Sequence, residues 1–172
     1  IPRMEQYPVR KIKKPIDWCV TVPGSKSMTN RALLMAALSD GTVTLDGVLF
    51  SDDSRHFISS LTALGFDVLV EEEKRRVMVK GESGTIPKKE AEIDVGSAGT
   101  AARFLTAMLG MSDGSYVIQA SGQMKKRPMK DLLLALEGLG ASFAYLEEPY
   151  HFPMKVTGMG INTEKCSKIF LN

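Results

Sequence analysis

The sequence is poor in the residues that carry most metal and thiol chemistry. Its 172 residues include two cysteines, two histidines and one tryptophan. The cysteines, Cys19 and Cys166, are far apart in the chain and match no zinc-binding spacing. We interpret them as free thiols in a reducing compartment, with a single disulfide as the alternative. The sequence therefore does not indicate a zinc site or a disulfide-rich scaffold.

Long apolar runs and a strong excess of one charge are also absent. The formal net charge is +2, and the basic residues are not interleaved with aromatics as in single-strand binders. No segment is long enough for a membrane span, and the N-terminal stretch IPRMEQYPVRKIKKP lacks the apolar core of a signal peptide. We therefore expect no nucleic acid, no membrane and a cytoplasmic location. A hydrophobic content of 44% and a charged content of 24% are typical of a globular domain.

The chain contains an internal repeat. Residues 26–81 and 97–158 each begin with small or polar residues and a helix, and both helices end in Ser-Asp-Gly, at 39–41 and 112–114. Each block continues with a strand, a second helix that ends in Leu-Gly, and two further strands. The period is about 75 residues. Two coincident helix ends of this kind indicate duplication of one structural unit.

Hydrophobic periodicity gives the elements of each unit. Helices are predicted over 29–38, 52–64, 98–109 and 128–139. Strands are predicted over 18–22, 42–47, 66–72, 76–81, 91–95, 115–120, 142–148 and 154–158. Each helix has one apolar face, and we interpret its methionines as core filler. The pattern predicts an α/β fold of two β-α-β-α-β-β units, at about 18–81 and 91–158.

Polar and cationic residues gather where these helices begin. Lys26 and Ser27 precede the first helix, and Arg31 follows one turn later. The second unit places similar residues at two helix starts, namely Ser97, Gly99 and Thr100, then Lys125, Lys126, Arg127 and Pro128. The first amides of a helix lack partners and carry partial positive charge. Because repeated units place equivalent helix ends on one side, we expect a single anion site there. No carboxylate is clearly placed beside Lys26 in this expected site.

Other motifs fit less well. A P-loop needs adjacent Gly-Lys with a further glycine four residues earlier, whereas residues 24–27 read Gly-Ser-Lys-Ser. No Gly-x-Gly-x-x-Gly follows an early strand, so a dinucleotide fold is not indicated. His56 is expected on the exposed side of its helix, without a role. Asp52 and Asp53 are interpreted as a helix cap and first-turn charge, with a site role for Asp53 as the alternative.

The stretch GSAGTAARFL allows two interpretations. Its small residues permit close helix packing, or Gly99 admits a ligand to the backbone. Arg103, one turn further on, is either a ligand arm or a structural ion-pair partner, and the structural role is favoured.

Three motifs occur in order along the chain: PGSKSMTNRALLMAALSDG, GSAGTAARFLTAML and GQMKKRPMKDLLLAL. Together they resemble the 5-enolpyruvylshikimate-3-phosphate (EPSP) synthase family, the 3-phosphoshikimate 1-carboxyvinyltransferases of aromatic amino acid biosynthesis. The resemblance runs from about Ile12 to Gly158. It implies an inside-out α/β barrel of the enolpyruvyl transferase type, with two of its repeated units present. Residues 1–22 would belong partly to the other domain, and residues 23–172 would form an incomplete N-terminal domain.

The resemblance also implies a reaction in the shikimate pathway toward chorismate. The enolpyruvyl group of phosphoenolpyruvate would pass to the 5-hydroxyl of shikimate 3-phosphate, with no metal or organic cofactor. Lys26 would be catalytic and touch both substrates, Ser27 and Arg31 would hold shikimate 3-phosphate, and Gly99 and Arg127 would hold phosphoenolpyruvate. The remaining catalytic groups would come from a C-terminal domain outside this chain. We therefore expect the chain alone to be inactive and the full-length enzyme to be a monomer.

Two positions depart from the family pattern. Ser97 stands where asparagine is usual, and Phe104 stands where proline is common. Neither change removes a charge, so we expect altered affinity rather than another substrate. Two alternatives remain: an inactive anion-binding half-domain, and a UDP-N-acetylglucosamine enolpyruvyl transferase, a family that shares the fold but lacks GSKSMTNR.

Overall fold

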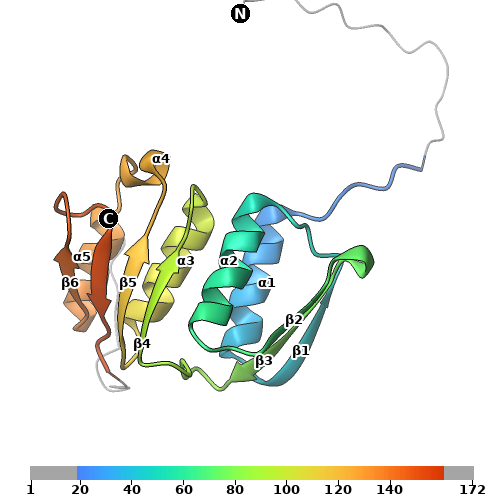
Figure 1. The fold of residues 1–172 in the computed structure, drawn as a ribbon, viewed down its shortest axis with the longest axis horizontal. Helices are drawn as coiled ribbons and strands as arrows, with labels where there is room; N and C mark the ends of the chain where they lie inside the picture. The colour runs from blue at the N-terminus through green and yellow to red at the C-terminus, as the bar shows by residue number, and fades with distance from the viewer. Residues whose placement is uncertain (1–18, 161–172) are drawn as a thin grey trace, which may run out of the picture.

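The computed structural model of the chain describes residues 19–160, which form two consecutive units (Figure 1). The first consists of α1 (Lys26–Leu38), β1 (Asp40–Asp46), α2 (Asp52–Ala63), β2 (Val68–Glu71), the 3₁₀ turn η1 (Glu72–Lys74) and β3 (Arg76–Glu82). The second consists of β4 (Glu90–Asp94), α3 (Gly99–Gly110), β5 (Ser115–Gln119), α4 (Gly122–Lys125), α5 (Lys130–Leu139), β6 (Ser142–Tyr145) and β7 (Met154–Thr157). The order of elements agrees with the predicted repeat, apart from the short α4 and a missing first strand.

The two sheets show the repeat at the level of strand pairing. One sheet has the order β1-β3-β2 and is antiparallel throughout. The other has the order β4-β5-β7-β6, in which β5-β7-β6 repeats the first arrangement and β4 pairs parallel to β5. Since β5, β7 and β6 occupy the same places in their unit as β1, β3 and β2, the units are equivalent in topology.

The strand predicted at the start of the first unit is wrong for residues 19–22, which form no strand; Trp18 lies outside the described residues. Figure 1 shows this segment running away from the nearby sheet. Val20 and Val22 are each 73% exposed, so their β propensity finds no edge to pair with. The assignment of residues 1–22 to another domain stays a prediction.

Helix starts differ from the predicted ones in two places. The Ser25 side chain caps α1 by accepting a hydrogen bond from the Met28 amide at 3.3 Å, so the helix begins three residues early. Lys26 and Ser27 therefore lie in its first turn rather than before it. The last helix begins at Lys130, after the separate turn α4, so Pro128 precedes α5 instead of opening it.

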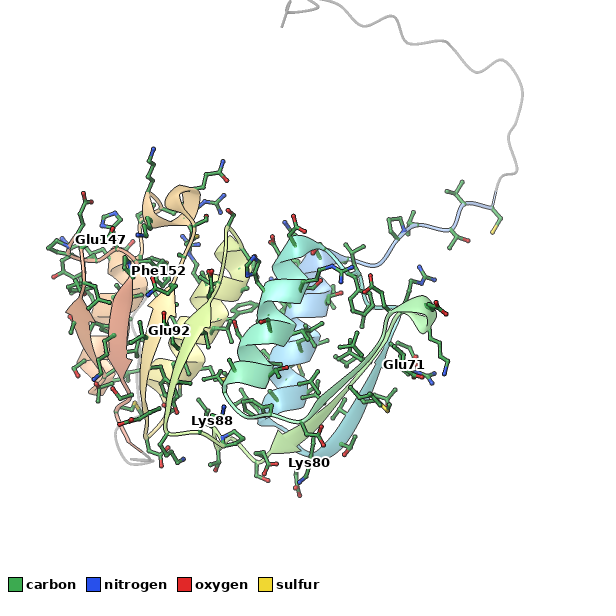
Figure 2. The ribbon with its side chains drawn as sticks, in the orientation of Figure 1. Glu71, Lys80, Lys88, Glu92, Glu147 and Phe152 are labelled. Carbon is green, nitrogen blue, oxygen red and sulfur yellow. The ribbon has the colours of Figure 1, made fainter. Side chains whose placement is uncertain are left out.

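The helices α1 and α2 lie between the two sheets, with α1 packed on β3 and α2 packed on β4 (Figure 1). Helix α3 contacts both of them, and its other side packs on β5, β7 and α5. The largest fully buried side chains include Leu33, Phe57, Leu61, Leu105, Leu109, Tyr116 and Phe152. Figure 2 shows charged side chains such as Lys80, Lys88 and Glu92, which are exposed. Burial of each large apolar side chain contributes about 1.5–3 kcal/mol, so this core holds the two units together.

The methionines do not all belong to this core. Met108 on α3 is 7% exposed, whereas Met35, at the matching place on α1, is 71% exposed. The interpretation of Met35 as core filler is therefore wrong. Helix α3 has neighbours on both sides, but this face of α1 is left uncovered by the residues that the structure describes.

The structure bears only in part on the predictions about the cysteines and about membrane spans. Cys19 is exposed, and Cys166 lies outside the described residues, so the interpretation of the thiols stays a prediction. Within residues 19–160, no helix is long and apolar enough to cross a membrane. The longest, α1, has 13 residues, whereas a span needs about 20.

The phenol of Tyr145 makes the stability of the fold decrease with rising pH in the alkaline range. Burial raises the pKa of Tyr145 to about 12, and the Glu137 carboxylate acts in the same direction. In the unfolded chain the group titrates near pH 10. Because the folded-state pKa is the higher one, the contribution of the neutral phenol is complete below about pH 10 and is lost as the pH rises toward 12. Urea unfolding over this interval should therefore show a shallower loss of stability for Tyr145→Phe than for the wild type, and equal slopes would contradict the assignment.

Candidate functional site

A cavity of about 440 Å³ lies where α1, α2 and α3 begin. Its lining consists of Lys26, Arg31, Asp53, Ser97, Gly99, Thr100, Arg103, Phe104 and Arg127. Four of these side chains are cationic and one is a carboxylate, so the cavity is suited to an anion. Among residues 19–160, no group of three histidine, cysteine or acidic side chains could hold a metal ion.

The structure brings most of the predicted site residues together. Lys26, Arg31, Gly99 and Arg127 all line this cavity, although they come from both units. Ser27 is not among the lining residues and is partly buried in the first turn of α1. The structure gives the positions of these five residues, and their roles in binding stay predictions.

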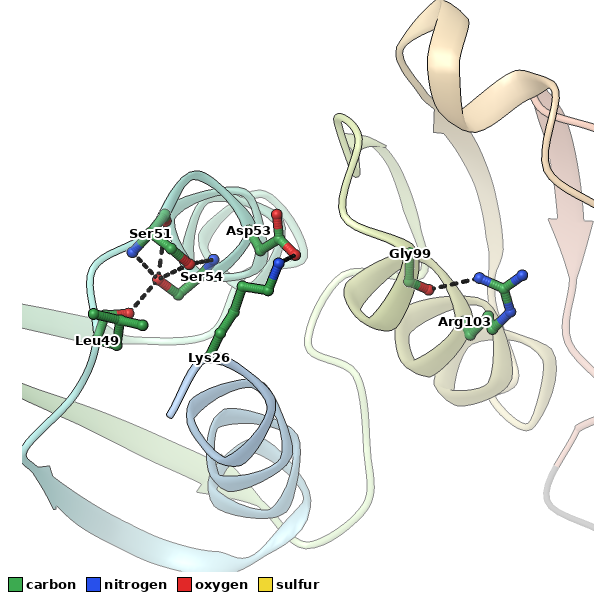
Figure 3. A network of polar contacts seen from close by, with 7 residues as sticks. All are labelled: Lys26, Leu49, Ser51, Asp53, Ser54, Gly99 and Arg103. Atoms are coloured by element: carbon green, nitrogen blue, oxygen red, sulfur yellow. Dashed lines mark hydrogen bonds and ion pairs between the residues drawn. The ribbon is translucent and has the colours of Figure 1, made fainter. Parts of the chain in front are cut away.

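Lys26 is held at the cavity by Asp53. Its Nζ lies 3.0 Å from the Asp53 Oδ2, and the two side chains are 54% and 19% exposed (Figure 3). The expectation that no carboxylate stands beside Lys26 is therefore wrong. An ion pair this exposed contributes about 0–1 kcal/mol to folding, so its main effect is to orient the ammonium group.

Asp53 faces Lys26 because other groups cap its own helix. Ser51 and Ser54 form a capping box at the start of α2, each side chain accepting a hydrogen bond from the other residue's backbone amide. The Ser54 hydroxyl also donates to the carbonyl oxygen of Leu49 at 2.6 Å (Figure 3). With these serines capping α2, the Asp53 carboxylate pairs with Lys26.

The start of α3 lacks any such cap. Its N-cap residue, Ala98, has no side chain that can accept a hydrogen bond, and no acidic residue lies in its first turn. Helix α1 also has no acidic residue in its first turn, whereas α2 has Asp52 and Asp53. The positive ends of α1 and α3 are therefore not neutralised by acids of their own first turns, as expected for an anion site.

Gly99 allows Arg127 to lie against the first turn of α3. A Cβ at this position would lie 2.6 Å from Nη1 of Arg127 and 3.3 Å from Nη1 of Arg103. Arg103 itself donates from Nη1 to the Gly99 carbonyl oxygen at 3.0 Å (Figure 3) and from Nη2 to that of Pro128 at 3.1 Å. Arg103 thus connects the start of α3 to the segment that carries Arg127. Its structural role is exerted through carbonyl groups rather than through an ion pair.

The two residues that depart from the family pattern both contact side chains from other segments of the chain. Phe104 presents its ring to Arg31, whose guanidinium carbon lies 5.9 Å from the ring centroid. This cation–π contact joins α1 to α3 and is worth about 0.5–1 kcal/mol at an exposed site. The hydroxyl oxygen of Ser97 lies 2.6 Å from that of Ser121. Both contacts fix side chains that line the cavity.

A second cavity, of about 610 Å³, shares Asp53 and Ser97 with the first. His56 lines it, partly buried, with its Nδ1 3.1 Å from the carbonyl oxygen of Asp94. The prediction of an exposed His56 is therefore wrong, because α2 packs against β4. Asp53 and His56 are three residues apart and therefore project from the same face of α2. This spacing is the sequence feature that could have predicted that both side chains face the same part of the structure.

Comparison with known proteins gives a consistent result. Residues 10–169 match the family model of EPSP synthase (3-phosphoshikimate 1-carboxyvinyltransferase). A 3-phosphoshikimate 1-carboxyvinyltransferase from Vibrio atlanticus (strain LGP32) is 42% identical over 165 residues, which are 95% of this chain and 38% of that protein. One from Nostoc sp. (strain PCC 7120) is 38% identical over 155 residues, 90% of this chain and 36% of that protein.

A solved structure extends the likeness to three dimensions. The EPSP synthase from Acinetobacter baumannii matches with a TM-score of 0.72 and 25% identity, over 81% of this chain and 31% of that chain. This agreement confirms the predicted fold class. The chain thus spans less than two fifths of the length of these relatives.

The close approach of Gly99 and Arg127 gives a direct test of the cavity. Gly99→Ala is expected to displace the Arg127 guanidinium and to weaken binding of inorganic phosphate, measured by titration calorimetry. One charge-assisted contact corresponds to about 1.5–3 kcal/mol, or roughly 10- to 100-fold in affinity. Gly138→Ala is the control, because its added methyl group meets only open space. Equal phosphate affinity in the two variants would show that Arg127 does not contribute.

Proposed function

The chain belongs to the EPSP synthase (3-phosphoshikimate 1-carboxyvinyltransferase) family, and on this basis we propose that it forms part of the substrate site for enolpyruvyl transfer. The reaction moves the enolpyruvyl group of phosphoenolpyruvate to the 5-hydroxyl of shikimate 3-phosphate and releases phosphate. The observation that carries the proposal is the cavity in which Lys26, Arg31 and Arg127 converge at the starts of α1 and α3. Both substrates are polyanions, and such an arrangement compensates their charge.

Each residue has a proposed share of the two substrates. Lys26 contacts both, Ser27 and Arg31 hold shikimate 3-phosphate, and Gly99 and Arg127 hold phosphoenolpyruvate. The geometry supports the last pair, because the glycine leaves the first amides of α3 open while the guanidinium lies beside them. Ser27 has the least support, since it does not line the cavity in the structure.

The chemistry explains why a cation must stand between the substrates. The 5-hydroxyl loses its proton to a base and its oxygen bonds to C2 of phosphoenolpyruvate, while the methylene carbon takes up a proton from an acid. The tetrahedral intermediate then expels phosphate, and loss of a methyl proton restores the double bond. The Lys26 ammonium stabilises the charge that develops on the departing phosphate, and a preorganised charge of this kind is worth more in the transition state than in the ground state.

Proton transfer requires more groups than this cavity provides. Efficient general acid–base catalysis depends on side chains of tuned pKa within reach of the reacting atoms. Asp53 is the carboxylate among the cavity's lining residues, and it is paired with Lys26. We therefore propose that the remaining acid–base groups lie in the part of the enzyme that the longer relatives contain and this chain does not.

The enzyme is proposed to act as a cytoplasmic monomer.

Substrate binding should divide along the two units. With this chain in titration calorimetry, Lys26→Ala should weaken binding of both substrates because its ammonium contacts both. Arg31→Ala should weaken only shikimate 3-phosphate, and Arg127→Ala only phosphoenolpyruvate, each by roughly 10- to 100-fold. Lys155→Ala, an exposed lysine on β7, is the charge-matched control and should change neither. Equal losses in all four variants would indicate a general charge effect instead of a site.

Turnover distinguishes a complete enzyme from an inactive anion-binding half. The 172-residue chain alone is expected to release no measurable phosphate from the two substrates, because positioning of both reactants supplies much of the rate. Addition of the separately produced remainder of a relative should restore release. Robust turnover by the chain alone would overturn this expectation. Activity with UDP-N-acetylglucosamine in place of shikimate 3-phosphate would favour the other transferase family.

A further inference from the structure

The cavity is divided between the two units of the fold. Lys26, Arg31 and Asp53 come from residues 26–82, and the other lining residues come from residues 90–158. Its shape therefore depends on how accurately one unit is placed against the other. Apolar helix packing between α1, α2 and α3 holds the units together but has little directional preference.

Directional contacts between the units are few. Within the described residues, one hydrogen bond links residues 26–82 to residues 90–158, and it runs from the Nδ1–H of His56 to the carbonyl oxygen of Asp94 at 3.1 Å. No ion pair in this part of the chain crosses between them. A carbonyl can only accept, so Nδ1 must carry the proton.

Gly96 makes room for this imidazole. A Cβ on Gly96 would collide with Nε2 of His56 and would lie 2.6 Å from Cδ2 and 2.7 Å from Cε1. The ring therefore covers the backbone of the turn that leads into α3. Gly96 also has a φ of 55°, a conformation that a side chain would strain.

The turn at Gly96 is also held by hydrogen bonds within residues 90–158. The Gly96 amide donates to Oδ1 of Asp94 at 2.8 Å, and its carbonyl accepts from the Ser121 amide at 3.0 Å. The Val95 amide donates to the carbonyl oxygen of Gln119 at 3.0 Å. These bonds join the turn to β5 and α4, but they do not set its distance from α1 or α2.

Helix α2 holds both halves of the cavity from one face. Asp53 and His56 lie three residues apart on it, so they project from the same side. Asp53 pairs with Lys26 on α1, and His56 binds the turn before α3. Helix α2 therefore helps to set the distance between Lys26 and Gly99, in addition to the direct Arg31–Phe104 contact between α1 and α3.

We propose that His56 is a positioning residue of the anion site, which sets the turn at Gly96 and the start of α3 at the correct distance from Lys26. His56 acts through the backbone of Asp94 and Gly96, not by contact with substrate. For its substrate readout this inference rests on the proposed function, in which Gly99 binds phosphoenolpyruvate while Ser27 and Arg31 bind shikimate 3-phosphate. Loss of the His56 contact should then impair phosphoenolpyruvate and spare shikimate 3-phosphate.

Two amide replacements separate positioning from mere helix stability. In His56→Asn the side-chain amide nitrogen occupies the place of Nδ1 and keeps the donor to Asp94, whereas in His56→Gln it occupies the place of Nε2 and loses that donor. Asparagine is the poorer helix former, so a simple effect on α2 would harm His56→Asn more. The positioning role predicts the opposite order.

The test is titration calorimetry of this chain with phosphoenolpyruvate and with shikimate 3-phosphate. His56→Gln and His56→Ala are expected to weaken phosphoenolpyruvate binding by about 2- to 10-fold, with His56→Asn close to wild type and shikimate 3-phosphate unaffected in all three. Equal weakening of both substrates, or a His56→Gln variant as good as His56→Asn, would overturn the inference.

A second measurement is independent of substrate. Amide hydrogen exchange at Val95 and Gly96 in the ligand-free chain should be faster in His56→Gln than in His56→Asn, and unchanged exchange would refute the positioning role. If the wild-type chain binds neither substrate, the proposed function fails, and the exchange rates still decide whether His56 positions the turn. Circular dichroism confirms that each variant is folded before either comparison.

Discussion

Repulsion between like charges is the constraint on which this site depends. Four cationic side chains and two helix N-termini face a cavity of about 440 Å³ that contains one carboxylate in its lining. Like charges gathered at one cavity repel one another until an anion enters it. The fold must hold these groups against that repulsion. A polyanionic ligand then binds to cationic groups that the folded structure already holds in place.

The repeated unit provides the framework for that gathering. Helices α1 and α3, which are equivalent in the two units, begin at the same cavity. The buried faces of α1, α2 and α3 hold the units together. Polar contacts then place the individual groups. Asp53 orients Lys26, while the Arg103 guanidinium ties the first turn of α3 to the Pro128 carbonyl and so brings Arg127 close. Small residues matter for the same reason, because Gly96 and Gly99 leave space for the ring of His56 and the guanidinium of Arg127.

The sequence allowed the repeat, the fold class and most of the lining of the cavity to be predicted. Local signals carried these results: the paired Ser-Asp-Gly and Leu-Gly helix ends, and the cations near helix starts. The helix starts were missed because of local features, such as the Ser25 cap of α1 and the separate turn α4. The misses at Lys26, His56 and Met35 depend on contacts between distant segments. The partners of Lys26 and His56 lie 27 and 38 residues away in the chain, and no local pattern reports them. Met35 has an apolar spacing like that of Met108, and only the packing of neighbouring helices distinguishes the exposed residue from the buried one.

The central claim is that the two units together form one binding site for anionic substrate. Backbone amide NMR shifts during titration of this chain with phosphoenolpyruvate test it most directly. The account predicts shifts at Lys26 in the first unit and at Gly99, Thr100 and Arg127 in the second, all saturating at one ligand concentration. Shifts confined to one unit, or saturation at different concentrations in the two, would contradict it.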